Sequence, residues 1–285
     1  MTSEIIMAKS TTRTNSLASI PGTVVLIGAG KMGGALLDGW LSRKLSPKKV
    51  VVIEPTPSKS IKALARRGVR INPKGSIGKV AAMVLAVKPQ TAPDALPSLA
   101  TLANPKTVVV SIMAGRTLGF LSTYFPDGAI VRAMPNTPAA IGRGITVAVG
   151  NRRVTASARK LAHSLLAATG SVEWADNEGL MDAVTAVSGS GPAYVFLLAE
   201  AMAQAGIAAG LSPALAEKLA RETVAGSGEL LHRSDLPAAT LRQNVTSPGG
   251  TTAAALAVLM GRDGVEPLMT KAVAAATKRG KELAG

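Results

Sequence analysis

A glycine-rich turn near the start of the chain has the residue types and the spacing to bind a dinucleotide. It consists of Gly28, Ala29, Gly30, Lys31, Met32 and Gly33, between an apolar run at residues 24–27 and a helical pattern. In such a motif the first glycine allows a tight turn, the second lets the backbone approach the pyrophosphate, and the third permits close contact between helix and strand. The alternative is a turn that binds nothing, but strand, turn and helix occur in the required order. The helix amides would then face the pyrophosphate along the helix dipole.

An acidic residue after the next apolar run bears on the choice of cofactor. Glu54 follows residues 50–53 and occupies the place where a carboxylate usually binds the ribose hydroxyls. Its charge favours NADH. Thr56, Ser58 and Lys59 follow and could hold the 2′-phosphate of NADPH. The sequence therefore leaves the choice between NADPH and NADH open.

A second turn, Ser-Pro-Gly-Gly-Thr-Thr at residues 247–252, lies between two helical patterns and opens the second. Amides at a helix start form an anion site, which suits a substrate carboxylate. The structural alternative is that Thr251 or Thr252 only caps the helix. Capping needs one hydroxyl, whereas the turn supplies three hydroxyls and two glycines. We therefore expect it to bind a ligand, with Ser247, Gly249, Gly250, Thr251 and Thr252 as the candidate contacts.

Three further stretches combine rigid or small residues with polar groups. Lys88 and Pro89 directly follow the apolar run at 81–87, and residues 135–138 follow the run at 130–134 with two prolines around Asn136 and Thr137. Both stretches are expected at the carboxyl edge of the sheet, where open α/β folds bind ligands. Residues 188–194, Ser-Gly-Ser-Gly-Pro-Ala-Tyr, form either a flexible linker or a turn packed against a ligand.

The elements that would position these residues alternate in type over the first half of the chain. Apolar runs occur at 23–28, 50–54, 81–87, 107–112 and 130–134, with a further edge strand expected at 144–150. Strands that alternate with helical patterns predict a doubly wound parallel sheet of the Rossmann type. From residue 154 the pattern is helical, over 154–169, 176–187, 193–209, 212–233, 238–245, 251–260 and 265–283.

These patterns predict an α/β chain with two domains. We expect a disordered leader at 1–20, a dinucleotide-binding domain at 21–150 and an all-α domain at 151–285. The helical part is rich in Ala and Gly. Small side chains bury little area each, so this domain is expected to need a partner surface, such as that of an intertwined dimer.

Composition excludes several classes of function. The formal charge is +15, but the cations are scattered and the chain has three Phe, two Tyr and two Trp, too few for nucleic-acid stacking platforms. There is no cysteine, and the two histidines lie far apart without metal-ligand spacing. Apolar runs are too short to span a membrane, and the leader lacks a signal-peptide core. We therefore expect a cytoplasmic protein without a metal, a nucleic-acid partner or a membrane partner.

Taken in order and spacing, five stretches resemble those of pyrroline-5-carboxylate reductases. They are residues 28–33, 86–89, 134–138, 188–194 and 245–252, and the last is the most specific. The resemblance covers about residues 23–285. It implies a Rossmann domain, a helical domain interleaved with its partner in a homodimer, often a larger ring of dimers, and an active site between subunits. Glu54 departs from many relatives and puts a preference for NADPH in doubt.

The same resemblance implies the reduction of 1-pyrroline-5-carboxylate to L-proline with NADPH or NADH, the last step of proline biosynthesis. The family's substrate contacts map to the 247–252 turn. Its cofactor contacts map to Gly28, Ala29, Gly30, Lys31 and Met32 and to Ala86, Val87, Lys88 and Pro89. Gly33, Glu54 and Asn136 are added to the cofactor set from their positions in the sequence.

The chemistry requires hydride transfer to the carbon of a C=N group whose nitrogen is protonated or hydrogen-bonded. We expect Thr252 to make that hydrogen bond and the amides of the 247–252 turn to fix the substrate carboxylate. Orienting the two rings is worth up to ~7–11 kcal/mol. No histidine or carboxylate stands out as a general acid, so water or prior protonation of the substrate would serve. Related alternatives are an imine reductase or a β-hydroxyacid dehydrogenase, and a nucleotide-binding regulator is the alternative outside enzymes.

Overall fold

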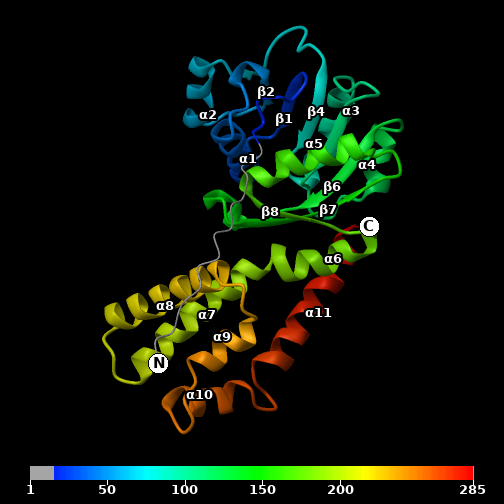
Figure 1. Ribbon diagram of the computed structural model, residues 1–285. Coiled ribbons are helices and arrows are strands. Elements are labelled where there is room, and N and C mark those ends of the chain that lie inside the picture. Colours follow the sequence, from blue (N-terminus) through cyan, green and yellow to red (C-terminus); the bar gives the residue numbers. More distant parts are fainter. Residues whose placement is uncertain (1–15, 285) are drawn as a thin grey trace. The chain divides into compact units, whose positions relative to one another are not determined.

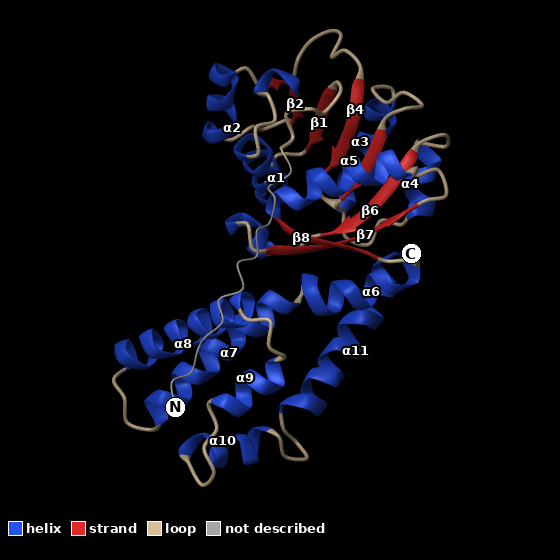
Figure 2. Cartoon of the chain, in the orientation of Figure 1, coloured by secondary structure: helices blue, strands red, loops and turns tan. Residues whose placement is uncertain are grey.

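The computed structural model describes residues 16–284, which form two compact units. The sheet unit contains residues 16–190 together with the end of the chain from 276, and the helical unit contains residues 191–275. Figure 1 labels the elements along the chain and Figure 2 separates helices from strands. Each unit is described by itself.

The sheet unit is built on one eight-stranded sheet with the order β3-β2-β1-β4-β5-β6-β7-β8. All neighbouring strands are parallel except β6 and β7. The strands are β1 (Thr23–Ile27), β2 (Val50–Ile53), β3 (Arg70–Ile71), β4 (Val80–Leu85), β5 (Val108–Ser111), β6 (Ala129–Met134), β7 (Gly144–Gly150) and β8 (Gly170–Trp174). The predicted doubly wound parallel sheet is confirmed, and its strand order reverses between β1 and β4.

Helices cover both faces of this sheet because its strands are apolar on both sides. All five residues of β1 and all six of β4 are buried. On one face Val24 and Leu26 pack with α1 (Lys31–Ser42) and α5 (Ala156–Leu166), and on the other Val25 and Ile27 pack with α3 (Ala92–Ala100) and α4 (Leu118–Tyr124). Continuous apolar strands of this kind are typical of parallel sheets buried on both faces.

One hydrogen bond ties α1 to α5 within the first of these layers. The indole N–H of Trp40 donates to the carbonyl of Leu165 at 2.9 Å, and the Trp40 side chain is fully buried. This bond satisfies the one polar group of a large core side chain. It therefore fixes the helix that carries the glycine-rich turn at its start.

The sheet extends further along the chain than the sequence predicts. The strand expected at the edge, β7, forms over Gly144–Gly150, but β8 pairs parallel to it and takes the edge position. Strands therefore do not end near residue 154, and residues 151–190 belong with the sheet rather than with the helical unit expected from residue 151. The physical reason is that β7 offers an open edge, which the short β8 covers after α5 returns the chain.

The expected leader also differs from the structure in its last five residues. Leu17 and Ile20 are buried in the core, and the Leu17 N–H donates to the Arg43 carbonyl at 2.9 Å. Residues 16–20 are therefore ordered, because two apolar side chains gain a buried site beside α1. The remainder of the expected leader, residues 1–15, lies outside the described residues.

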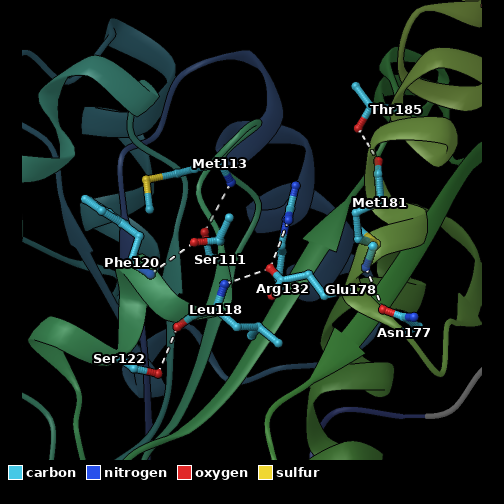
Figure 3. A network of polar contacts seen from close by, with 12 residues as sticks. Ser111, Met113, Leu118, Phe120, Ser122, Arg132, Asn177, Glu178, Met181 and Thr185 are labelled. Atoms are coloured by element: carbon cyan, nitrogen blue, oxygen red, sulfur yellow. Dashed lines mark hydrogen bonds and ion pairs between the residues drawn. The ribbon is translucent and has the colours of Figure 1, made fainter. Parts of the chain in front are cut away.

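A buried ion pair joins β6 to the short helical segment that follows β8 (Figure 3). Arg132 Nη1 lies 2.9 Å from Glu178 Oε1, with only 6% of the Arg132 side chain exposed. The same carboxylate oxygen accepts the Leu118 N–H at 2.7 Å, at the start of α4. A carboxylate at a helix start is favourable. Glu178 thus connects three elements of the sheet unit.

The helical unit contains α7 (Gly191–Ala208), α8 (Pro213–Arg233), α9 (Ala238–Asn244), α10 (Thr251–Leu259) and the first part of α11 (Val265–Ala284). Helices α7 and α8 pack closely through small residues, because a Cβ at Gly206 would lie 3.2 Å from that of Ala216. Among the described residues of this unit, the buried ones are Ala203, Ala216 and Ala220. The unit therefore has a small core of its own.

Large apolar side chains of this unit are exposed instead. Val195, Phe196, Leu197 and Leu198 of α7 expose between 46% and 67% of their surface, and α8, α10 and α11 expose further Leu, Val and Met residues. Apolar patches of this size on a single chain mark protein interaction surfaces. This agrees with the expectation that the helical part needs a partner surface.

Candidate active site

The glycine-rich turn lies at the point where the strand order of the sheet reverses. Gly28 follows β1 and Ala86 follows β4, and these two strands are neighbours. The Ala86 N–H donates to the Ile27 carbonyl at 2.7 Å, and the Gly28 N–H donates to the Ile53 carbonyl at 2.9 Å. In open α/β sheets, ligands bind at the carboxyl ends of the strands at such a reversal. The structure thus brings together the turn and the segment at 86–89.

The three glycines of the turn have three different environments. Gly28 has φ +89°, and a Cβ there would lie 2.7 Å from the Ala86 carbonyl oxygen. At Gly33 a Cβ would collide with the Gly28 carbonyl, whereas at Gly30 it would meet nothing within 4 Å. Gly28 and Gly33 are therefore required by packing. Gly30 instead leaves open space beside the backbone.

That open space lies at the start of α1, where Gly30 is the N-cap residue. A glycine has no side chain to accept from the first amides of the helix, and these amides have no carbonyl partner within the helix. Open space, free amides and a positive helix end together fit the pyrophosphate of a dinucleotide. This part of the chain is suited to hold NADH or NADPH.

Glu54, directly after β2, turns its carboxylate toward this turn. Its Oε2 accepts the Ala29 N–H at 2.8 Å, and its Oε1 accepts the Thr56 N–H at 3.1 Å. The backbone of Glu54 is held in turn by Asn72, whose side chain bonds both its N–H and its carbonyl. Asn72 was not predicted as a site residue, because nothing in the sequence signals a bond across 18 residues.

The segment after β4 is fixed by a second residue that the sequence did not single out. Arg116 donates from Nε and Nη2 to the Pro89 carbonyl at 3.0 and 2.7 Å. Its guanidinium also stacks 4.6 Å from the centre of the Phe120 ring. The Lys88 carbonyl accepts two hydrogen bonds from Thr91, one from its backbone N–H and one from its hydroxyl. Residues 88 and 89 are therefore held in place at the carboxyl edge of the sheet.

Asn136 follows β6 at the same edge of the sheet. Its Oδ1 accepts the Ile145 N–H at 2.9 Å. This hydrogen bond joins the segment after β6 to the beginning of β7. The oxygen of this side chain thus has a structural partner. The Nδ2 amide of Asn136 is therefore the candidate ligand contact of this side chain.

The stretch at 188–194 is helical rather than a turn. A π-helical segment, Thr185–Gly189, leads into α7, with the Ser190 N–H donating to the Thr185 carbonyl at 2.9 Å. A Cβ at Gly189 would lie 2.7 Å from Met134 Cε, at the end of β6. Met134 and Gly189, one from each of two noted stretches, therefore meet within the sheet unit.

The turn at 247–252 lies in the helical unit, between α9 and α10. The Gly250 N–H donates to the Ser247 carbonyl at 3.1 Å, and Gly249 has φ +69°, as a turn with proline and then glycine at its centre requires. Gly250 is the N-cap of α10, so Thr251 and Thr252 are its first two residues. The suggested capping role for either threonine is therefore wrong, because a residue inside the helix cannot occupy the N-cap position.

A cavity of the sheet unit lies away from all of these residues. It has a volume of about 620 Å³ and lies where β1, β4, β5 and β6 begin, beside Leu17, Lys79 and Lys106. No residue proposed here for cofactor or substrate lines it.

The described residues contain no group of three or more His, Asp or Glu side chains that could hold a metal ion. No helix among them is long and apolar enough to cross a membrane.

Two family models match the two parts of the chain. The model for pyrroline-5-carboxylate reductase dimerisation matches residues 178–283. The model for NADP oxidoreductase, coenzyme F420-dependent, matches residues 23–115, which contain the glycine-rich turn.

Whole-chain comparisons agree with these models. The pyrroline-5-carboxylate reductase of a Synechocystis species is 42% identical over 263 residues, which is 90% of this chain and 97% of that protein. That of Pseudomonas aeruginosa is 36% identical and covers 92% of this chain and 96% of that protein.

Solved structures show the same fold. The pyrroline-5-carboxylate reductase of Coxiella burnetii has a TM-score of 0.84 at 32% identity, covering 92% of this chain and 98% of that one. The Plasmodium falciparum pyrroline carboxylate reductase, solved with NADP bound, has a TM-score of 0.76 at 28% identity, covering 93% and 99%. The chain therefore belongs to the pyrroline-5-carboxylate reductase family and is an NAD(P)H-dependent oxidoreductase.

Proposed function

We propose that this protein reduces 1-pyrroline-5-carboxylate to L-proline with hydride from NADPH or NADH, the last step of proline biosynthesis. The observation that carries the proposal is that one chain of this family holds both an open nucleotide-binding turn at Gly30 and a Ser-Pro-Gly-Gly-Thr-Thr turn at the start of α10. When bound, the cofactor supplies the hydride. The residues of the chain bind and orient the two reactants.

We propose that the sheet unit holds the cofactor. Gly28, Ala29, Gly30, Lys31, Met32 and Gly33 would face the pyrophosphate, and Ala86, Val87, Lys88 and Pro89 would line the dinucleotide beyond it. The Glu54 carboxylate would face the adenosine ribose, since it already lies against the Ala29 amide. The amide nitrogen of Asn136 is the proposed donor at the edge of β6, because its oxygen is bonded to Ile145.

We propose that the helical unit holds the substrate carboxylate. The first amides of α10, including those of Thr251 and Thr252, have no carbonyl partner within the helix and face outward at its positive end. Ser247, Gly249 and Gly250 complete the turn without a bulky side chain. A carboxylate held there would be bound by backbone donors, which do not change protonation state near neutral pH.

The Thr252 hydroxyl is the proposed catalytic group. It would donate to, or share a proton with, the imine nitrogen and so favour the electrophilic form of the C=N carbon. A positioned hydrogen bond at a charge that changes in the transition state is an efficient form of catalysis. The proton that the product nitrogen needs would come from water or from the protonated substrate.

The family model for dimerisation and the exposed apolar helices support a homo-oligomer. We propose that the basic assembly is an intertwined homodimer with the active site between subunits, that dimers join in a larger ring, and that the protein acts in the cytoplasm. Phe196 and its neighbours on α7 would lie in the dimer interface, because they are the longest run of exposed large apolar residues.

The direct test is oxidation of NADPH and NADH by purified protein on addition of 1-pyrroline-5-carboxylate, with L-proline identified by chiral chromatography. The matched control substrate is 1-pyrroline, which lacks the carboxylate. We expect much lower kcat/KM for the control, since the 247–252 turn would have no anion to bind. Equal rates with both imines would favour a general imine reductase. Absence of turnover by a protein that still binds the cofactor would contradict the proposal.

A further inference from the structure

Asn72 directly follows β3, in a backbone conformation that residues with a side chain seldom adopt. Its φ is +44°, and among the described non-glycine residues only Lys44 also has a positive φ. Asn tolerates this left-handed region better than most residues, though still at some cost. The Asn72 N–H donates to the Val52 carbonyl at 2.8 Å and continues the pairing of β3 with β2. The unusual conformation thus lies beside the end of β2.

The conformation lets the Asn72 side chain pair with the backbone of Glu54. Its Oδ1 accepts the Glu54 N–H at 2.9 Å, and its Nδ2 donates to the Glu54 carbonyl at 2.8 Å. One carboxamide therefore satisfies both backbone polar groups of one residue, Glu54, as a neighbouring strand would. Aspartate could not do this, because it has no N–H to donate to the carbonyl.

The pairing determines where the Glu54 carboxylate can lie. With the backbone of Glu54 held, its Oε2 accepts from the Ala29 amide at 2.8 Å and its Oε1 from the Thr56 amide at 3.1 Å. Oε2 is thus held at the glycine-rich turn, and Oε1 is held at Thr56 in the segment that follows β2. The negative charge is fixed where the 2′-position of the adenosine ribose would arrive.

We infer that Asn72 is a positioning residue for cofactor preference: by holding the backbone of Glu54, it keeps the carboxylate where it accepts the ribose hydroxyls of NADH and repels the 2′-phosphate of NADPH. This inference rests on the proposed role of Glu54. Removing a residue that only stabilised the turn after β3 would weaken the binding of both cofactors equally. Removing a residue that acts through Glu54 changes the ratio of the two dissociation constants.

The test is Asn72→Gly, made both in the natural chain and together with Glu54→Gln. Glycine adopts φ +44° freely, so the turn is kept while both side-chain hydrogen bonds are removed. Dissociation constants for NADPH and NADH are measured by nicotinamide fluorescence, which needs no turnover. We expect Asn72→Gly to change the ratio of the two dissociation constants in favour of NADPH by roughly three- to tenfold, because residues in contact couple by such amounts.

The double variant decides whether the effect passes through Glu54. With Glu54→Gln present, the charge is gone, and Asn72→Gly should leave the ratio unchanged. Lys44→Gly is the matched control, since it also replaces a left-handed non-glycine residue in the sheet unit. We expect that variant to keep the natural ratio.

Three results would overturn the inference: an equal shift in both backgrounds, equal weakening of both cofactors by Asn72→Gly, or an unchanged ratio in Glu54→Gln alone. The first two reject Asn72, and the third rejects the role of Glu54. A protein that does not reduce 1-pyrroline-5-carboxylate would still report on Asn72 in these titrations, so failure of the proposed reaction is separate.

Discussion

The Gly28 carbonyl oxygen occupies the space in which a Gly33 Cβ would lie. The first residues of α1 and the end of β1 are therefore in backbone contact, and the contact depends on the absence of a side chain. At Gly30, within the same turn, an added Cβ would meet nothing within 4 Å. A side chain added at Gly33 should therefore disturb the fold, whereas one added at Gly30 should not.

Gly30→Val should abolish binding of NADH and NADPH and leave the fold intact, because the side chain would enter space that the pyrophosphate needs. Fluorescence titration measures the binding, and circular dichroism with a melting curve checks the fold. Gly33→Ala is the matched variant, and it should lower stability markedly because the Cβ collides with backbone. Unchanged affinity in a folded Gly30→Val protein would refute the nucleotide-binding assignment.

Glu54→Ser should shift preference toward NADPH. Removing a carboxylate near the 2′-phosphate removes a repulsion, and we expect the ratio of kcat/KM for NADPH to that for NADH to rise roughly tenfold, about 1.4 kcal/mol. Steady-state kinetics with each cofactor measures this ratio. If the ratio stays constant or moves toward NADH, the Glu54 carboxylate does not face the ribose.

Thr252→Ala tests the proposed catalytic hydroxyl. Loss of a transition-state hydrogen bond should lower kcat/KM by roughly 10- to 100-fold with little change in cofactor affinity. The melting temperature should change little, because Gly250 and not Thr252 is the N-cap of α10. Normal kinetics for Thr252→Ala would move the role to Ser247 or Thr251, whose alanine variants are the parallel measurements.

Arg132→Met should destabilise the sheet unit. It leaves the Glu178 carboxylate, 28% exposed, without its cation but still bonded to the Leu118 amide. We expect the free energy of unfolding to fall by about 2–3 kcal/mol, somewhat less than for a fully buried ion pair. Arg153→Met is the control, since the Arg153–Asp127 pair is exposed at 55% and 77% and should contribute at most about 1 kcal/mol.

Chemical denaturation at one fixed protein concentration compares the two arginine variants, so that any oligomer is treated equally. Equal losses in Arg132→Met and Arg153→Met would show that burial of the Arg132–Glu178 pair does not matter. Loss of cofactor binding by a stable Arg132→Met protein would show a role for the pair beyond stability.

Phe196→Glu should dissociate the oligomer and abolish turnover. Phe196 is 67% exposed on one chain, and a charge at the centre of an apolar interface is costly. Light scattering coupled to gel filtration measures the mass. Lys106→Glu, an exposed site in the sheet unit, controls for the change of charge and should keep the natural mass. An intact assembly in Phe196→Glu would place the interface elsewhere.

The sequence alone determined the alternating strands and helices of the first half, the glycine-rich turn between β1 and α1, and the helices that carry the 247–252 turn. These features follow from local rules. Apolar runs between turn residues form buried strands, and glycine spacing sets where a backbone can turn tightly. For the same reason the candidate contacts at 28–33 and 247–252 were predicted without a structure, while those at 86–89 were predicted from the resemblance to the family.

Only the tertiary structure decided which residues hold those contacts in place. Asn72 bonds Glu54 from the residue after β3, and Arg116 bonds the Pro89 carbonyl from the loop before α4. Strand β8 exists because β7 presents an open edge to it, and residues 16–20 are ordered because Leu17 and Ile20 find a buried site. Each of these contacts depends on groups that are far apart in the chain and meet only after folding. No local pattern of residue types can therefore predict them.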